Sequence, residues 1–223
     1  MTGLLRIALL NPNTNSVTTR VMTAIAAECT AGRALIDGRT VPFGPPIITT
    51  PAGLAHAAMQ VVDTGRSLRH EGFAGIIISG FGDPGLADLR RLLDIPITGI
   101  AEAGMAEAAV GGRRFSVVTT TPDLKDAIKA TARSYGHGAL LASVRITPGV
   151  AEVTMADPEG LAKALLCACL AAVAEDGAEA IVIGGGPLAL AARAISRDVP
   201  VPLIEPVRAG ACLSLRRCLQ NQL

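Results

Sequence analysis

Residues 72–82 read Gly72-Phe-Ala-Gly-Ile-Ile-Ile-Ser-Gly-Phe-Gly82, a short apolar run that ends in a glycine-rich turn. A run of this length without polar alternation is typical of a parallel strand buried on both faces. Similar runs recur and are separated by longer segments with helical periodicity. Together they predict an α/β fold built on parallel sheets, with the clearest strands at Ile7–Leu10, Ile76–Ile78, Ile97–Ile100, Ser116–Val118, Ala180–Ile183 and Val201–Ile204.

The chain repeats itself at an offset of about 105 residues. The opening segment corresponds to Gly177-Ala-Glu-Ala-Ile-Val-Ile-Gly-Gly-Gly-Pro187. Two further pairs follow the same order: Arg6-Ile-Ala-Leu-Leu-Asn-Pro-Asn-Thr14 with Arg114-Phe-Ser-Val-Val-Thr-Thr-Thr-Pro122, and Asp94-Ile-Pro-Ile-Thr-Gly-Ile100 with Asp198-Val-Pro-Val-Pro-Leu-Ile204. The repeat predicts two pseudo-symmetric lobes, each a parallel sheet flanked by helices. Chance similarity between generic strand–helix units is the alternative.

The first lobe is predicted to comprise residues 1–112 together with 207–223, and the second lobe residues 113–206. Ligands of open parallel sheets collect at the carboxyl ends of the strands. We therefore expect a site in the inter-lobe cleft, built by four strand-end loops: Asn11–Asn15, Gly80–Gly85, Thr119–Pro122 and Gly184–Pro187.

The composition excludes several classes of partner. Charged residues make up 17% of the 223 residues and the net charge is +1, so nucleic acid is not expected as a partner. The longest apolar stretch, Leu161–Val173, contains Lys163 and is too short to span a membrane. Because Arg6 interrupts the apolar N-terminus, we expect no signal peptide and a cytoplasmic protein.

The cysteines predict neither a disulfide framework nor a metal site. Their number is odd, and no CxxC or HxxxH spacing occurs in the sequence. The five residues, all in segments with helical periodicity, are Cys29, Cys167, Cys169, Cys212 and Cys218.

The strand-end loops supply neutral donors suited to a carboxylate or an imide. Helix capping alone explains only some of these polar residues. The fourth loop lacks the lysine of a phosphate-binding loop and the spacing of a dinucleotide motif. The predicted substrate-binding residues are Asn11, Asn13, Thr14, Gly80, Phe81, Gly82, Thr119, Thr120, Thr121, Gly185, Gly186 and Pro187.

Four ionisable residues are candidates for acid/base catalysis. Asp83 lies in the third loop, where it alternatively caps a helix that starts near Pro84. Glu102 and Glu205 each follow a predicted strand. His56 lies in a predicted helix, where an ordinary position on the helix face is the alternative.

Several motifs together resemble the hydantoin racemase branch of the Asp/Glu racemase superfamily. They are Asn11-Pro-Asn-Thr14, Phe43-Gly-Pro45, Asp83-Pro-Gly-Leu86, Gly99-Ile-Ala-Glu-Ala103, Phe115-Ser-Val-Val-Thr-Thr120 and Asp176-Gly-Ala-Glu-Ala-Ile-Val182. The resemblance spans nearly the whole chain. It implies two α/β lobes, no cofactor, a small carboxylate or hydantoin as substrate, and a homo-oligomer.

The chain departs from that family at two positions. Where the resemblance implies a pair of catalytic thiols, one before Phe-x-Asp-Pro-Gly and one in Gly-Cys-Ala-Gly, this sequence has Gly80 and Gly185. Glycine neither removes nor delivers a proton, so thiol-dependent racemisation is not expected. Fixed donors in the loops can still stabilise an enolate or oxyanion. The related arylmalonate decarboxylases keep just one thiol, so the scaffold resembles one that tolerates loss of a thiol while its chemistry changes.

Three hypotheses follow from the sequence. The first is an enzyme that acts on a small hydantoin-like or carboxylate substrate with non-thiol acid/base chemistry, of a lyase, hydrolase or isomerase type. The second is a hydantoin or amino-acid racemase in which a carboxylate or histidine replaces a thiol. The third is a small-molecule binding protein without catalysis.

Overall fold

The computed structural model describes residues 4–221 and divides them into two compact lobes. The first lobe contains the chain up to Ile48, the segment Ala52–Ala103 and the chain from Val207 onward. The second lobe contains Thr49–Pro51 and Gly104–Pro206. The division after Ala103 falls inside a helix, whereas the sequence predicted a boundary near Gly112.

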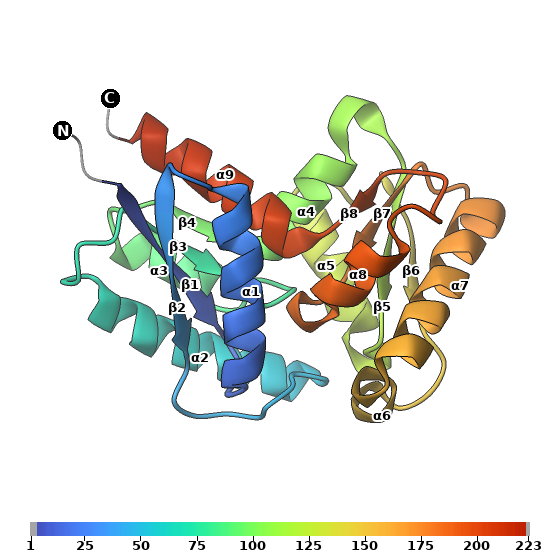
Figure 1. The fold of residues 1–223 in the computed structure, drawn as a ribbon, viewed down its shortest axis with the longest axis horizontal. Helices are drawn as coiled ribbons and strands as arrows, with labels where there is room; N and C mark the ends of the chain where they lie inside the picture. The colour runs from blue at the N-terminus through green and yellow to red at the C-terminus, as the bar shows by residue number, and fades with distance from the viewer. Residues whose placement is uncertain (1–3, 222–223) are drawn as a thin grey trace. The chain divides into compact units, whose positions relative to one another are not determined.

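The first lobe is built on a four-stranded parallel sheet with the strand order β2-β1-β3-β4 (Figure 1). Its strands are β1 (Leu5–Asn11), β2 (Ala34–Thr40), β3 (Gly75–Ile78) and β4 (Ile97–Gly99). The helices that accompany them are α1 (Ser16–Cys29), α2 (Pro51–Leu68), α3 (Leu86–Leu92), the start of α4 (Ile100–Ala108), and α9 (Pro206–Gln220).

The second lobe repeats this arrangement with the strand order β6-β5-β7-β8. Its strands are β5 (Phe115–Thr119), β6 (Leu141–Ile146), β7 (Ala180–Ile183) and β8 (Leu203–Ile204). Its α-helices are α5 (Lys125–Ser134), α6 (Ala151–Ala156), α7 (Pro158–Asp176) and α8 (Ala189–Ile195). Short 3-10 turns η1 (Val110–Gly112), η2 (Pro122–Leu124) and η3 (Gly186–Leu188) connect them.

The matching strand orders confirm the α/β fold with two similar lobes. The central strands β3, β5 and β7 consist entirely of buried residues, and β1 does so except at Arg6, because helices cover both faces of a parallel sheet. Helix α9, drawn in red in Figure 1, returns to the first lobe, where the Cys218 thiol donates a hydrogen bond to the carbonyl of Ala74 at 3.3 Å.

Edge strands β2 and β6 were not predicted from the sequence. Each has one fully buried residue, Ala34 and Val144 respectively, and carries charged or polar side chains elsewhere. Their sequences therefore lack the continuous apolar run that marks a central strand. Two predicted strands are also shorter than expected, since Ile100 begins helix α4 and β8 starts only at Leu203.

In the part of the chain that the structure describes, no helix is long and apolar enough to cross a membrane.

Edge strand β6 is tied to the end of helix α7 by a hydrogen-bonded ion pair. Arg145 donates from Nε and Nη2 to the two carboxylate oxygens of Asp176 at 2.6 and 2.8 Å, and Ser143 Oγ donates to the same carboxylate at 2.6 Å. The hydrogen bond from Arg145 lowers the pKa of Asp176 to about 2, aided by Ser143 and against the opposing effect of burial.

Because its folded-state pKa is depressed, Asp176 stabilises the protein above its usual pKa of 3.8, and this contribution is lost as the pH falls towards 2. We expect Asp176→Asn to lower the free energy of unfolding at pH 7 by about 1–2 kcal/mol and to weaken its fall between pH 4 and 2. Urea denaturation across this pH range measures both effects. Asp126→Asn is the control, since Asp126 is almost fully exposed beside Lys129 and should change little. Parallel pH profiles for Asp176→Asn and the parent would contradict the assignment.

Candidate active site

The loop after β1 is held by a network of asparagine side chains. Asn11 is fully buried, and its Nδ2 donates to Asn13 Oδ1 at 3.0 Å, to the carbonyl of Asn15 at 3.1 Å and to Thr19 Oγ1 at 2.9 Å. Its Oδ1 accepts from the Asn13 amide at 3.2 Å. Asn11 therefore shapes the loop from within, while the Nδ2 group of Asn13 takes no part in these bonds.

The start of α1 is capped by Asn15. Its Oδ1 accepts from the backbone amides of Val17 and Thr18 at 3.0 and 3.1 Å. Thr14, one residue earlier, instead donates from Oγ1 to the carbonyl of Gly44 at 3.3 Å. Helix capping thus accounts for Asn15. The hydrogen bond of Thr14 joins the loop after β1 to the segment that follows β2.

His56 lies close to this segment. A Cβ placed on Gly44 would be 3.5 Å from His56 Cδ2 and 3.8 Å from its Nε2. The imidazole is half-buried on α2 and forms no hydrogen bond or ion pair with any residue between 4 and 221. His56 and Thr14 therefore both lie near Gly44 in the first lobe.

The loop after β3 is anchored by Asp83. Its side chain is buried, and its two carboxylate oxygens accept from the backbone amides of Ala101 at 2.9 Å and Glu102 at 2.7 Å. Asp83 has a positive φ of 51°, an uncommon conformation for a residue other than glycine. The negative carboxylate thus meets the positive end of α4.

This geometry corrects one sequence expectation. Asp83 does not cap the helix that follows it, because α3 starts at Leu86 with Gly85 as its N-cap and no side-chain hydrogen bond at that position. The carboxylate instead joins two segments 18 residues apart. Gly99 makes this possible, since a Cβ at that position would overlap the carboxyl group of Asp83.

Three buried threonines, Thr119 to Thr121, lie at the carboxyl end of β5 in the second lobe. Thr119 Oγ1 donates to the carbonyl of Gly184 at 2.7 Å and lies 3.2 Å from Thr121 Oγ1. Thr120 Oγ1 has a single weak partner, the sulfur of Met155 at 3.7 Å. None of these hydroxyls caps the turn at Pro122–Leu124, so ordinary capping does not account for this loop.

Gly80 and Gly185 occupy equivalent positions in the two lobes. The amide of Ser79 donates to the carbonyl of Leu10, and the amide of Gly184 donates to the carbonyl of Val118. These acceptors lie on the central strands β1 and β5 in the same register. The next residue in each loop is therefore Gly80 in one lobe and Gly185 in the other.

The two positions differ in the space available for a side chain. A Cβ on Gly80 would overlap the ring of Pro12, whose shape allows little adjustment. A Cβ on Gly185 would meet only the side chain of Leu188, at 3.3 Å. Gly185 therefore accepts a side chain more readily than Gly80 does.

Phe81 and Gly82 continue the loop after Gly80, and both are half-buried. In the second lobe, Gly186 and Pro187 belong to the turn η3. Each predicted loop thus lies at the carboxyl end of a strand. The two loops of a lobe follow neighbouring strands, β1 and β3 in the first lobe and β5 and β7 in the second.

Glu102 is held by two arginines and is less available for acid/base chemistry. Arg90 Nη2 donates to both carboxylate oxygens at 2.9 and 2.8 Å, and Arg217 donates to the same two oxygens at 2.8 and 3.0 Å. Burial raises the pKa of Glu102, but the hydrogen bonds and charges of Arg217 and Arg90 outweigh it and lower the pKa overall.

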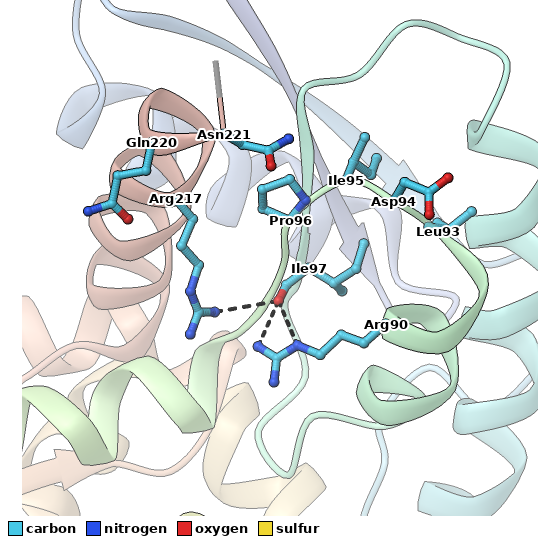
Figure 2. Close-up of a pocket in the computed structure, with 9 residues that line it drawn as sticks. All are labelled: Arg90, Leu93, Asp94, Ile95, Pro96, Ile97, Arg217, Gln220 and Asn221. Carbon is cyan, nitrogen blue, oxygen red and sulfur yellow. Dashed lines mark hydrogen bonds between the residues drawn. The ribbon is translucent and has the colours of Figure 1, made fainter. Parts of the chain in front are cut away.

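The same two arginines line a pocket of about 540 Å³ that the sequence did not indicate (Figure 2). Both donate to the carbonyl of Ile97, the first residue of β4, so the pocket lies at the opposite end of that strand from the Asp83 contact. The pocket contains none of the predicted site residues; its other lining residues are Leu93, Asp94, Ile95, Pro96, Gln220 and Asn221.

Glu205 lies between β8 and α9 in the sequence. Its side chain is buried and interacts with another residue of the protein.

The cysteines all lie in helices, as expected. Burial raises the pKa of Cys169 to about 12 and also raises that of Cys218, so both thiols stay protonated at neutral pH. Neither is suited to act as a base.

Fold and site together define a two-lobed α/β protein whose strand-end loops present neutral hydrogen-bonding groups. A family model described as Asp/Glu/hydantoin racemase matches residues 7–213. The chain is 31% identical over 208 residues to a hydantoin racemase of Paenarthrobacter aurescens, which covers 92% of this chain and 88% of that protein.

Two solved structures of allantoin racemases are similar over 98% of this chain. The protein from Klebsiella pneumoniae is 33% identical with a TM-score of 0.90, over 89% of its own chain. The protein from Pseudomonas fluorescens is 28% identical with a TM-score of 0.91, over 92% of its own chain. The chain therefore belongs to the Asp/Glu/hydantoin racemase family of enzymes, and its resemblance to the hydantoin racemase branch is confirmed.

The role of Asp83 as an anchor predicts a specific coupling with Gly99. We expect Gly99→Ala to lower the free energy of unfolding by about 1–3 kcal/mol, because the new methyl group displaces the Asp83 carboxyl. In an Asp83→Gly background, which keeps the positive φ accessible, Gly99→Ala should cost clearly less. A double-mutant cycle by urea denaturation measures the difference, and additive costs would contradict the coupling.

The space around the two glycines predicts unequal costs for the same substitution. Gly80→Cys should lower the free energy of unfolding by about 1–3 kcal/mol, because its Cβ forces the Pro12 ring to move. Gly185→Cys should change it by less than about 1 kcal/mol, since only the Leu188 side chain has to adjust. Denaturation of both variants under reducing conditions tests this order, and an equal cost at both sites would be inconsistent with the geometry.

Proposed function

We propose that this chain is an enzyme that exchanges the proton on the acidic carbon of a hydantoin-type ring, with racemisation as the outcome, and without a thiol. The observation that carries the proposal is the similarity over 92–98% of the chain to proteins named hydantoin racemase and allantoin racemase. None of these relatives is named for a lyase or hydrolase activity, so those alternatives have no support from the comparisons.

The charge of the loops favours a neutral ring over an amino acid. None of the four strand-end loops contains lysine or arginine. Their one ionisable residue is Asp83, and both of its carboxylate oxygens accept backbone hydrogen bonds. A hydantoin presents carbonyl and N–H groups without a permanent charge, which neutral hydroxyl, amide and backbone groups can match.

In this proposal the loops bind the ring and stabilise its enolate. Removing the proton from the ring carbon between the carbonyl and the nitrogen places negative charge on the carbonyl oxygen. The hydroxyl of Thr120, which has only the weak acceptor Met155 as a partner, is the donor we assign to the ring. Fixed donors aimed at a developing oxyanion contribute strongly to such reactions.

Among the four acid/base candidates, we assign removal of the ring-carbon proton to His56, and we assign to water the proton that reaches the opposite face of the enolate and completes racemisation. The carboxylates of Asp83 and Glu102 are held by backbone amides and by arginines, respectively, which suits positioning roles. The imidazole of His56 has no such partner among the residues described, and neutral histidine is a suitable base near neutral pH. Glu205 is the alternative.

The experiment is proton exchange in heavy water, with 5-methylhydantoin, 5-benzylhydantoin and allantoin as substrates. Loss of the ring-carbon proton signal in NMR spectra reports exchange, and polarimetry reports racemisation. We expect enzyme-dependent exchange that is at least as fast as racemisation, because a single base can return a deuteron to the face from which it removed the proton. Pretreatment with iodoacetamide should have no effect.

We expect His56→Gln to slow the exchange by at least about 100-fold, the loss typical of a missing general base. His70→Gln is the matched control, since His70 is exposed beyond the end of α2 and should keep the parental rate. An unchanged rate in His56→Gln would remove His56 as the base. If the parent exchanges no substrate but a ring ligand still raises its melting temperature, the proposed reaction is wrong and a binding protein is indicated.

A further inference from the structure

Thr147 lies at the carboxyl edge of the second-lobe sheet, immediately after β6. Its backbone amide donates to the carbonyl of Thr119 at 2.9 Å, which continues the pairing of β6 with β5. It therefore lies next to the threonines that follow β5. Thr147 was not predicted as a site residue from the sequence, because it belongs to none of the four loops.

The side chain of Thr147 is 3% exposed, and its hydroxyl has no hydrogen-bond partner among residues 4–221. A buried hydroxyl without a partner is unfavourable, since the group loses its hydrogen bonds to water and gains none. Such groups are rare in folded proteins, and each calls for an explanation.

The fold itself does not require this hydroxyl. The equivalent residue of the first lobe is Val41, whose amide donates to the carbonyl of Asn11 at 3.1 Å in the same register. Each of the two residues is followed by proline, and Val41 is also buried, at 1% exposed. Valine has nearly the same shape as threonine, so the first lobe fills this position with a methyl group in place of the hydroxyl.

A second hydroxyl at the carboxyl edge of the same sheet is also poorly partnered. Thr120 Oγ1 reaches only the Met155 sulfur at 3.7 Å, and a thioether is a weak acceptor. Thr119, in contrast, donates to the carbonyl of Gly184. Thr120 and Thr147, at the ends of neighbouring strands, thus have hydroxyl groups with a weak partner or none among the described residues. The weak partner of Thr120, Met155, lies on α6.

We propose that Thr147 is a substrate-binding residue whose hydroxyl, together with that of Thr120, donates to polar atoms of the ring ligand. This assignment rests on the proposed function and deepens it. Since the Thr147 hydroxyl is buried in the free protein, ligand binding requires the neighbouring chain to move, and we assign this movement to the segment after Pro148. Gly149, at a φ of 95°, is the residue of that segment best able to change its backbone conformation.

The test is the nearly isosteric substitution Thr147→Val. It should raise the melting temperature of the ligand-free protein by about 2–4 °C, because it removes an unpartnered buried hydroxyl. It should also weaken binding of 5-methylhydantoin and allantoin about tenfold, measured by isothermal titration calorimetry, with Thr147→Ser restoring most of the affinity. The opposite signs of the two effects distinguish a ligand contact from a structural role.

Thr30→Val is the matched control. Thr30 is 1% exposed, but its hydroxyl donates to the carbonyls of Ala26 and Ala27 at the end of α1. This variant should lower the melting temperature and leave ring affinity unchanged.

The outcomes distinguish a failure of the Thr147 assignment from a failure of the proposed function. If the parent binds the rings and Thr147→Val binds them equally well, the role of Thr147 is overturned and the proposed function stands. A Thr147→Val protein that melts at a lower temperature than the parent shows a partnered hydroxyl and also overturns it. If the parent binds none of the rings, the proposed function fails and the ligand assignment of Thr147 fails with it.

Discussion

The contact on which the first-lobe site depends is the Asp83 carboxylate at the start of α4. Its two oxygens accept the amides of Ala101 and Glu102, so a loop that follows β3 is fixed to a helix that follows β4. The attraction between a carboxylate and the positive end of a helix makes this contact favourable although Asp83 is buried. Gly99 leaves the space for it. The position of Gly80, three residues before Asp83, follows from this contact.

Glu102 joins that contact to the rest of the lobe. Its amide binds Asp83, while its carboxylate binds Arg90 of α3 and Arg217 of α9. Helices α3, α4 and α9 are thereby linked through one residue. Four charge-assisted hydrogen bonds from the two arginines hold this carboxylate in place, which makes the arrangement rigid. A rigid frame suits a loop whose backbone donors must keep their positions while charge develops on a ligand.

Much of this architecture could be predicted from sequence, because buried parallel strands and an internal repeat leave strong local patterns. The equivalence of Gly80 and Gly185 follows from that repeat. Edge strands β2 and β6 could not be found in this way, since their side chains are mixed in polarity. The partner of Asp83 lies 18 residues away, and no local spacing indicates it. Thr147 was missed for a different reason: its signal is a hydrogen bond that is not made.

The two lobes share a strand order but differ in how they use their polar groups. In the first lobe, Asn11 and Asp83 direct their side chains to the protein's own backbone and to neighbouring side chains. In the second lobe, Thr120 and Thr147 keep hydroxyls with a weak partner or none among the described residues. An internal repeat makes this difference between the lobes informative. For each residue of one lobe, the equivalent residue of the other lobe shows which side chains the same fold accepts at that position. Val41 and Thr147 are counterparts that differ in polarity but hardly in shape, so at this position a functional requirement is separable from a structural one.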